Sequence, residues 1–152
     1  MPEWSYSMET YDPTTMVRAS GRELRISPKA AREVCAAIKG MMLGEAKEFL
    51  RNVIAKKVAV PYRRYRKKLP HRRGLEGAGR YPVKAASKIL EVLENAEANA
   101  DYKGLDMEKL KIIHASAYPG AKIRRYMPRA FGRATRWFET LTHVEVVLQE
   151  MK

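Results

Sequence analysis

The stretch that decides the fold is residues 120–136, GAKIRRYMPRAFGRATR, which contains six basic residues and no acid. The segments on either side of it, Leu110–Tyr118 and Trp137–Leu148, have the composition of β-strands. In the second segment one face carries Phe138, Thr140, Thr142, Val144, Val146 and Leu148, and the other carries Glu139, His143, Glu145 and Gln149. This alternation predicts a half-buried strand. The simplest pairing of the two segments is one extended antiparallel hairpin over residues 110–148.

The predicted hairpin is too long and too polar to be stable alone. If its arms continue to a turn near Pro128–Gly132, each holds about 20 residues, and at ~3.3 Å per residue the ribbon is about 60 Å long. A two-stranded ribbon is only marginally stable in water, and the far part of this one offers few apolar side chains. We therefore expect a partner to hold it, and the arginines indicate a partner rich in phosphate.

The residue types of the hairpin favour RNA as that partner. Guanidinium groups bind phosphate in a bidentate manner and stack on bases. Tyr126 and Phe131 lie among the arginines and can stack on unpaired bases. The candidate RNA-binding residues are Lys122, Arg124, Arg125, Tyr126, Arg129, Arg133 and Arg136, and the tip is Met127, Pro128, Arg129, Ala130, Phe131 and Gly132. The alternative is a solvated, flexible basic loop.

A second basic segment precedes the hairpin. Residues 58–80 have no apolar period and contain several prolines and glycines, so we expect a basic loop. Tyr62 and Tyr65 are interleaved with its cations, as in segments that bind RNA. The candidate RNA-binding residues here are Arg63, Arg64, Arg66, Lys67, Lys68, Arg72, Arg73 and Arg80. The alternative is a disordered loop that binds nothing.

The whole chain is strongly basic. Its 152 residues include 30 Lys and Arg against 17 Asp and Glu, a net charge of +13. Such an excess repels itself in a compact state and points to a polyanionic partner. Nucleic acid is the first candidate and an anionic membrane the second. No apolar run approaches the roughly 20 residues that a membrane-spanning helix needs, which argues against a membrane span.

Three amphipathic segments precede the hairpin. Apolar residues recur in each of them at three- and four-residue spacing, the pattern of one helix face. Ser27 and Pro28 mark the start of the first, with Ser27 as the N-cap and Pro28 at the first helical position. We expect helices at about residues 28–42, 45–57 and 82–100.

These elements predict an α+β fold. Val17–Ile26 reads as a short strand that can join the arms of the hairpin. We expect a single domain over residues 17–152, in which a small three-helix body packs on a short antiparallel sheet and the long hairpin protrudes. Residues 1–16, with the aromatic side chains Trp4 and Tyr6, read as an N-terminal arm that becomes ordered on a partner.

No pattern in the sequence predicts catalysis. His71, His114 and His143 lie far apart, and none has metal-ligand spacing to another histidine or to Cys35. Cys35 lies on the apolar face of the first helix and reads as an inert core thiol. The glycine-rich run at 74–79 lacks the preceding strand and the Lys-Ser/Thr ending of a phosphate loop. We expect no enzyme activity, no metal and no cofactor.

Cysteine content and the N-terminal residues favour the cytoplasm. One cysteine allows no intrachain disulfide and fits a reducing compartment. Residues 1–15 contain three acids and no basic segment followed by an apolar one, so they do not read as a secretory signal.

The residues of the hairpin resemble a known family. Met127–Ala134 (MPRAFGRA), followed by Thr142–Val147 (THVEVV), resembles the hairpin signature of the universal large-subunit ribosomal protein twenty-two family. Upstream, Arg25–Ala30 (RISPKA) and Leu110–Ile112 agree with the family in order, so the resemblance covers about residues 17–149. The basic loop at 58–80 resembles the archaeal and eukaryotic branch and is absent from bacterial members.

The resemblance implies a structural constituent of the large ribosomal subunit that binds and stabilises ribosomal RNA. It implies that the hairpin lines the nascent-peptide exit tunnel near its constriction, with neighbouring ribosomal proteins, the nascent chain and exit-site factors as further partners. The family's tunnel residues carry over to Arg124, Arg125, Met127, Arg129, Gly132 and Arg133. Phe131 departs from the bacterial pattern, which usually has Lys there.

Two other function classes remain as alternatives. An RNA-processing or RNA-modifying enzyme would need a group of acid, base or metal-binding residues, and activity lost on changing His114 or His143 would reveal it. A DNA-compacting basic protein would prefer duplex DNA to folded RNA at equal salt.

Overall fold

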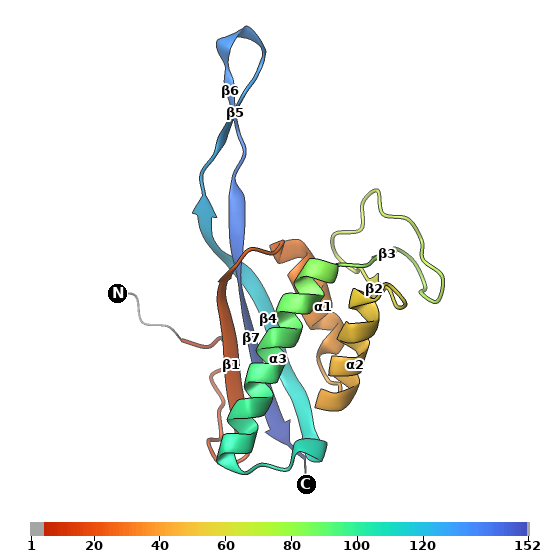
Figure 1. Cartoon of the computed structure of the whole chain (residues 1–152), viewed down its shortest axis with the longest axis vertical. Coiled ribbons are helices and arrows are strands. Elements are labelled where there is room, and N and C mark those ends of the chain that lie inside the picture. The colour runs from red at the N-terminus through yellow and green to blue at the C-terminus, as the bar shows by residue number, and fades with distance from the viewer. Residues whose placement is uncertain (1–4, 152) are drawn as a thin grey trace.

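A computed structural model describes residues 5–151 of the chain (Figure 1). The helices are α1 (Pro28–Ile38), α2 (Leu43–Ile54) and α3 (Val83–Lys103). The strands are β1 (Met16–Leu24), β2 (Val60–Pro61), β3 (Gly79–Arg80), β4 (Leu110–Ile123), β5 (Tyr126–Pro128), β6 (Ala134–Arg136) and β7 (Glu139–Glu150). Helices and antiparallel strands together confirm the expected α+β class. Residues 1–4 of the expected N-terminal arm, with Trp4, and also Lys152, lie outside the described residues.

A three-stranded antiparallel sheet with the order β1-β7-β4 forms the centre of the body. The helices lie together on one face of this sheet (Figure 1). Val144, Val146 and Leu148 of β7 are fully buried there, and the core includes Leu50 of α2 and Leu93 of α3. Each such side chain contributes roughly 1.5–3 kcal/mol by leaving water. This core fixes the base from which the hairpin and the basic loop project.

The helices begin and end close to the predicted positions, with local differences. Ser27 holds the N-cap position of α1, but its side chain makes no capping hydrogen bond. α1 ends at Ile38 rather than near residue 42, because the chain turns there and the amide of Gly40 donates to the carbonyl of Ile112, 2.8 Å away. In α3, Val92 is buried, whereas Leu90 is only partly buried.

Strand β7 is buried on both faces, which corrects the predicted alternation. Glu145, expected on the solvent side, is fully buried, and so is Val147. The cause is the N-terminal arm, which lies across the face of the sheet opposite the helices. The backbone N–H of Ser7 donates to the Glu145 carboxylate at 3.2 Å, and the ring of His114 lies 3.0 Å from the same carboxylate. The described part of the arm therefore has partners within the chain, contrary to the expectation that it needs an external one.

The basic loop is hydrogen-bonded at its base, which refines the prediction of a featureless loop. Strands β2 and β3 pair there through Val60 and Arg80 and through Pro61 and Gly79. The amide of Tyr62 donates to the carbonyl of Ala78 at 3.0 Å. Tyr62, expected among the RNA-facing aromatic residues, is only 8% exposed and belongs to the core, where burial raises the pKa of its phenol. That expectation was wrong.

Strands β4 and β7 form a hairpin whose far end is continued by β5 and β6 (Figure 1). The β4–β7 ladder runs from Leu110 opposite Glu150 to Ile123 opposite Glu139. Irregularities in β4 between Ile112 and His114 and between Pro119 and Lys122 bend and twist this ladder. At the break before β5, the amide of Trp137 donates to the carbonyl of Arg125 at 2.7 Å, so the two arms stay joined.

Candidate nucleic-acid interface

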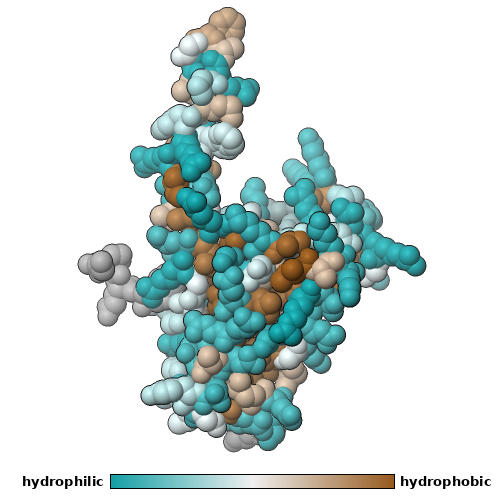
Figure 2. Space-filling view, viewed as in Figure 1, coloured by the Kyte–Doolittle hydropathy of each residue, from teal (hydrophilic) through white to brown (hydrophobic). Residues whose placement is uncertain are grey.

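The outer hairpin, which we define as residues 116–140, presents its cations to solvent. No residue between 116 and 140 is buried, and the candidate side chains of this region are exposed except Met127, which is intermediate. Burial therefore does not hold this part of the chain, as its polar sequence predicted. Figure 2 shows it standing clear of the body, with apolar colour at its far end above hydrophilic side chains. The structure brings the hairpin candidates together on one thin projection.

The turn at the tip has an unusual backbone. Phe131 has φ 58° and ψ 35°, and Gly132 follows with φ 65°. The left-handed conformation is routine for glycine but costs most other residues about 1–2 kcal/mol. The Phe131 ring is nonetheless 92% exposed, and the Arg133 guanidinium lies 5.9 Å from its centroid. The turn thus presents an aromatic ring and a cation outward at the end of the ribbon.

A second aromatic group lies below the tip. The rings of Tyr126 and Phe138 meet edge to face at 5.8 Å across the ribbon, and the Arg136 guanidinium lies 6.0 Å from the Phe138 centroid. Trp137 is 64% exposed. Edge-to-face pairs contribute roughly 0.5–1.5 kcal/mol beyond the area that they bury. This group both stiffens the ribbon and leaves exposed ring surface beside arginines. Trp137 was not among the sequence candidates, because it read only as the first residue of a strand.

Gly120 in β4 leaves room for the ring of His143 in β7. A Cβ atom at this position would lie 2.5 Å from Nε2 of His143. The other ring nitrogen of His143 accepts a hydrogen bond from the amide of Glu23 at 3.2 Å, and the ring also lies near Tyr118. His143 therefore ties β1 to the hairpin at the level where the ribbon leaves the sheet. The sequence marked Gly120 only as the start of the basic stretch.

The basic loop forms the second group of candidates, on a separate projection (Figure 1). Seven of its eight candidate cations are exposed, and Arg72 is half-buried. Arg72 donates from Nε to the carbonyl of Gly79 and lies 5.4 Å from the centroid of the Tyr81 ring. Arg72 therefore has a structural role inside the loop, whereas the other seven cations point to solvent.

Glu33 fixes the start of this loop, a role that no sequence pattern predicted. Its carboxylate on α1 is 1% exposed, and it accepts hydrogen bonds from the amides of Arg63 at 2.9 Å and Arg64 at 3.3 Å. Arg32 Nη1 lies 2.8 Å from the same carboxylate. A buried carboxylate is costly unless it is hydrogen-bonded and paired in this way. A glutamate among alanines in a helix reads as a solvent-facing residue, and only the folded loop reveals its partners.

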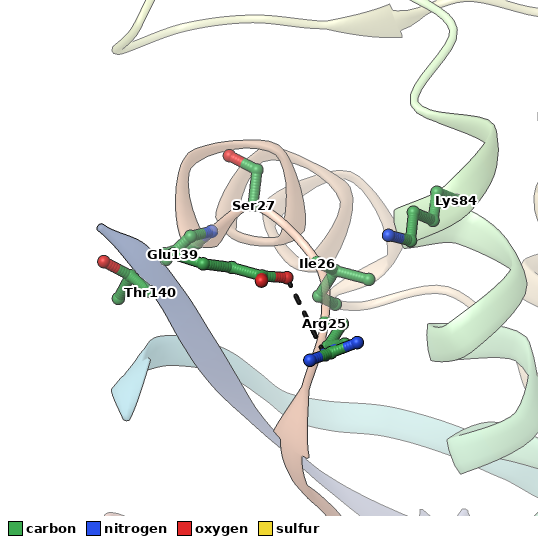
Figure 3. A pocket seen from close by; sticks show the side chains of 7 residues that line it. Arg25, Ile26, Ser27, Lys84, Glu139 and Thr140 are labelled. Carbon is green, nitrogen blue, oxygen red and sulfur yellow. Dashed lines mark ion pairs between the residues drawn. The ribbon is translucent and has the colours of Figure 1, made fainter. Parts of the chain in front are cut away.

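A further hollow lies where the hairpin meets the body (Figure 3). It has a volume of about 370 Å³ and is lined by Arg25, Ile26, Ser27, Pro28, Lys84, Glu139 and Thr140. Arg25 faces Glu139 across it with an N–O distance of 3.8 Å. This acid offsets part of the positive charge, so the hollow is a weaker anion site than the two projections.

The charges of the two projections are not neutralised within residues 5–151. No ion pair in that range joins a cation of the basic loop or of the outer hairpin to a carboxylate, whereas Lys47 and Lys88 of the body pair with Glu97 and Glu91. In the same range, no three His, Cys, Asp or Glu side chains are grouped so as to hold a metal ion. None of the described helices is long and apolar enough to cross a membrane. The arrangement is suited to binding a polyanion at two places.

The sequence of the chain is similar to those of known proteins. The chain is 56% identical to the large ribosomal subunit protein uL22 of Methanopyrus kandleri, over 97% of this chain and 96% of that protein. It is 52% identical to the protein of the same name from Archaeoglobus fulgidus, over 98% and 97% of the two chains. The protein of that name from Methanocaldococcus jannaschii is 54% identical, over 91% and 90%. Residues 19–149 match the family described as ribosomal protein L22p/L17e. The chain therefore belongs to the ribosomal protein L22p/L17e family.

Proposed function

We propose that this protein is a structural constituent of the large ribosomal subunit, where it binds ribosomal RNA and stabilises its fold. The observation that carries the proposal is the pair of basic projections, whose exposed cations have no carboxylate partners among the described residues. The name shared by the relatives, large ribosomal subunit protein, supports it. A role in structure rather than catalysis fits a family of ribosomal proteins.

The shape of the hairpin indicates what kind of RNA surface it binds. A two-stranded ribbon without a core is thin enough to lie between RNA helices, where a globular domain does not fit. Its cations can neutralise phosphates on both sides of such a crevice, and release of counterions then drives binding. The exposed rings of Phe131 and Tyr126 can stack on unpaired bases. Because the ribbon has no buried side chains of its own, contacts with the RNA would stabilise its conformation.

The proposal includes a place at the nascent-peptide exit tunnel. The hairpin tip, Met127–Gly132, would line the tunnel, with neighbouring large-subunit proteins and the nascent chain as further partners. The likeness of the tip residues to the family signature supports this placement. We propose the cytoplasmic ribosome as the location. We also propose that residues 17–152 act as one domain, with residues 1–16 as an arm.

The test is binding to deproteinised large-subunit ribosomal RNA over a range of salt concentrations. If the projections neutralise about ten phosphates, the slope of log K against log salt is roughly −7 to −9. The protein should also remain with the large subunit through a high-salt wash. Sedimentation as free protein at moderate salt would contradict the proposal. Tighter binding to duplex DNA at equal salt would indicate a DNA-compacting protein, and turnover of an RNA substrate that depends on His114 or His143 would indicate an enzyme.

A further inference from the structure

A pocket lies between the start of α1 and the basic loop. It has a volume of about 400 Å³ and is lined by Lys29, Arg64, Tyr65, Arg66, Lys67, Leu69 and Arg80. Five of these seven residues are cations, one is aromatic, and none is acidic. Sites for small ligands have volumes of roughly 300–1,000 Å³, so this one is large enough for a single nucleotide and too small for a duplex.

The walls of the pocket are held in place before any ligand binds. On one side Glu33, buried in α1, accepts the amides of Arg63 and Arg64 and so ties the start of the loop to the helix. On the other side β2 and β3 pair, which fixes the backbone of Arg80. Between these two anchors the buried Tyr62 belongs to the core. The pocket is thus built on the body, although the loop that forms it is mostly exposed.

The lining combines a flat ring with several positive charges. Tyr65 is 41% exposed, and the ammonium group of Lys29 lies 5.4 Å from the centroid of its ring. An exposed aromatic ring offers a surface on which a base can stack, and the surrounding cations can bind its phosphates. A carboxylate-rich peptide would use the cations but has no group that stacks on the ring. The chemistry therefore favours a nucleotide over an acidic peptide.

We propose that this pocket holds one unpaired nucleotide of RNA, with its base stacked on Tyr65 and its phosphates bound by Lys29, Arg64 and Arg80. The proposal rests on the proposed function, in which RNA is the partner. It adds Lys29 to the RNA-binding residues and gives Tyr65, already expected to face RNA, a specific partner. It also gives Glu33 a positioning role, because Glu33 holds the backbone of Arg64 where its side chain lines the pocket.

The test uses the full chain and two RNA duplexes of the same length. One duplex has a single bulged 2-aminopurine nucleotide, and the other is fully paired. We expect the protein to bind the bulged duplex about tenfold more tightly, since stacking on one aromatic side chain has an effect of this order. We also expect quenching of the 2-aminopurine fluorescence. Tyr65→Ala should remove both the preference and the quenching and leave the affinity for the paired duplex unchanged.

Two further variants separate the pocket from other effects. Tyr102→Ala is the matched control, because Tyr102 is 94% exposed and lies near the C-terminal end of α3, outside the pocket lining. It should leave the preference unchanged. Glu33→Gln should reduce the preference while the affinity for the paired duplex stays the same. An unchanged preference in a folded Glu33→Gln protein would overturn the positioning role.

The outcomes distinguish this inference from the proposed function. Equal affinity of the native protein for both duplexes, or equal losses on both duplexes in Tyr65→Ala, would overturn the pocket but not the function, provided that large-subunit RNA still binds. Failure to bind large-subunit RNA would overturn the function itself. Displacement of the bulged duplex by a polyglutamate peptide at lower concentration than by a single-stranded oligonucleotide of equal charge would identify the pocket as a peptide site and overturn the inference.

Discussion

Phe131 combines an unfavourable backbone conformation with an exposed side chain. Its φ of 58° lies in the left-handed region, and its ring is 92% exposed. Residues held in such conformations gather at functional sites, where strain serves a contact with a ligand. A residue chosen for the stability of the isolated chain would be glycine or asparagine. We infer that the ring is retained for a contact outside the chain.

The first prediction concerns this residue. Phe131→Gly removes the strain and no internal packing, so the free energy of unfolding of the isolated protein should stay the same or rise by up to about 1 kcal/mol. Affinity for large-subunit ribosomal RNA should fall, because a stacking surface is lost. Urea unfolding and RNA titration of the same preparation measure both. A loss of unfolding free energy above about 2 kcal/mol would show that the ring packs within the chain.

Cys35 gives the second prediction, which concerns pH. Burial raises the pKa of its thiol from 9.0 to about 12, and the nearby Glu145 carboxylate adds to the rise. Between these two pH values the unfolded chain has lost the thiol proton and the folded chain keeps it. This contribution to stability is therefore fully present below pH 9 and decreases as pH rises toward 12. Cys35→Ala lacks the thiol and should lack this decrease.

The comparison that measures this effect is between the native chain and Cys35→Ala at pH 8 and at pH 10.5. Other groups titrate in both proteins, so only the difference between their unfolding free energies reports Cys35. The difference should shrink at the higher pH. A difference that stays constant would show that the thiol is accessible enough to ionise in the folded chain.

Gly120 gives the third prediction. A Cβ atom there would meet the His143 ring, which also accepts the amide of Glu23, so Gly120→Ala must move a ring held on two sides. We expect a loss of about 1–3 kcal/mol in unfolding free energy, as for other overpacked sites. Gly44→Ala is the control, because nothing lies within 4 Å of its added Cβ and it lies in α2. It should gain a few tenths to about 1 kcal/mol.

At the scale of elements, different interactions stabilise the outer hairpin and the body. The body is held by buried apolar side chains, while residues 116–140 include none that is buried. Backbone hydrogen bonds and a few ring contacts hold the ribbon, such as the edge-to-face pair of Tyr126 and Phe138. The two parts should therefore respond differently to deletion.

The fourth prediction is that the hairpin can be shortened without unfolding the body. Replacing residues 124–137 with a short Asn-Gly turn should leave the helical circular dichroism and the midpoint of thermal unfolding nearly unchanged. The replacement removes five arginines, so the slope of log K against log salt for RNA binding should become less negative by about 4 units. Loss of the helical signal would mean that the outer ribbon stabilises the body.

The elements were largely predictable from the sequence, and the reasons for the exceptions are physical. Helix periodicity located α1, α2 and α3 because apolar spacing follows from burial on one side. The same logic failed at Glu145, because a strand pattern does not reveal that a distant segment, the N-terminal arm, covers its second face. It failed at Tyr62 because a tyrosine between cations reads as RNA-facing, although here it fills the core. Glu33 was missed because its partners are backbone amides, which no sequence pattern marks.

At the scale of the whole molecule, the excess of positive over negative charge is concentrated on two projections, because nearly all acidic residues lie elsewhere in the chain. The basic loop and the outer hairpin leave the body separately and share no described ion pair. We propose that the two projections bind different parts of one RNA. Such a protein can hold two RNA segments at a fixed separation.

The fifth prediction tests the independence of the two projections. Changing Arg63, Arg66 and Lys68 to glutamine should make the slope of log K against log salt less negative by about 2–3 units. Combining these changes with the shortened hairpin should reduce the steepness of the slope by the sum of the two separate effects, since distant sites without shared partners act additively. Binding measured from 50 to 300 mM salt gives all the slopes. A combined loss clearly smaller than the sum would indicate that both projections bind the same RNA segment.

The order β1-β7-β4 has a consequence for how the chain is made. Its central strand is the last of the three in the sequence, so β1 and β4 have no common neighbour until Glu139–Glu150 has left the ribosome that synthesises it. The helices can form early, but the sheet on which they pack assembles only after β7 has emerged. The basic segments therefore emerge while the body is still incomplete, and a newly made chain is open to capture by any nearby polyanion. Delivery of this protein to its site should accordingly depend on protection until β7 has joined the sheet.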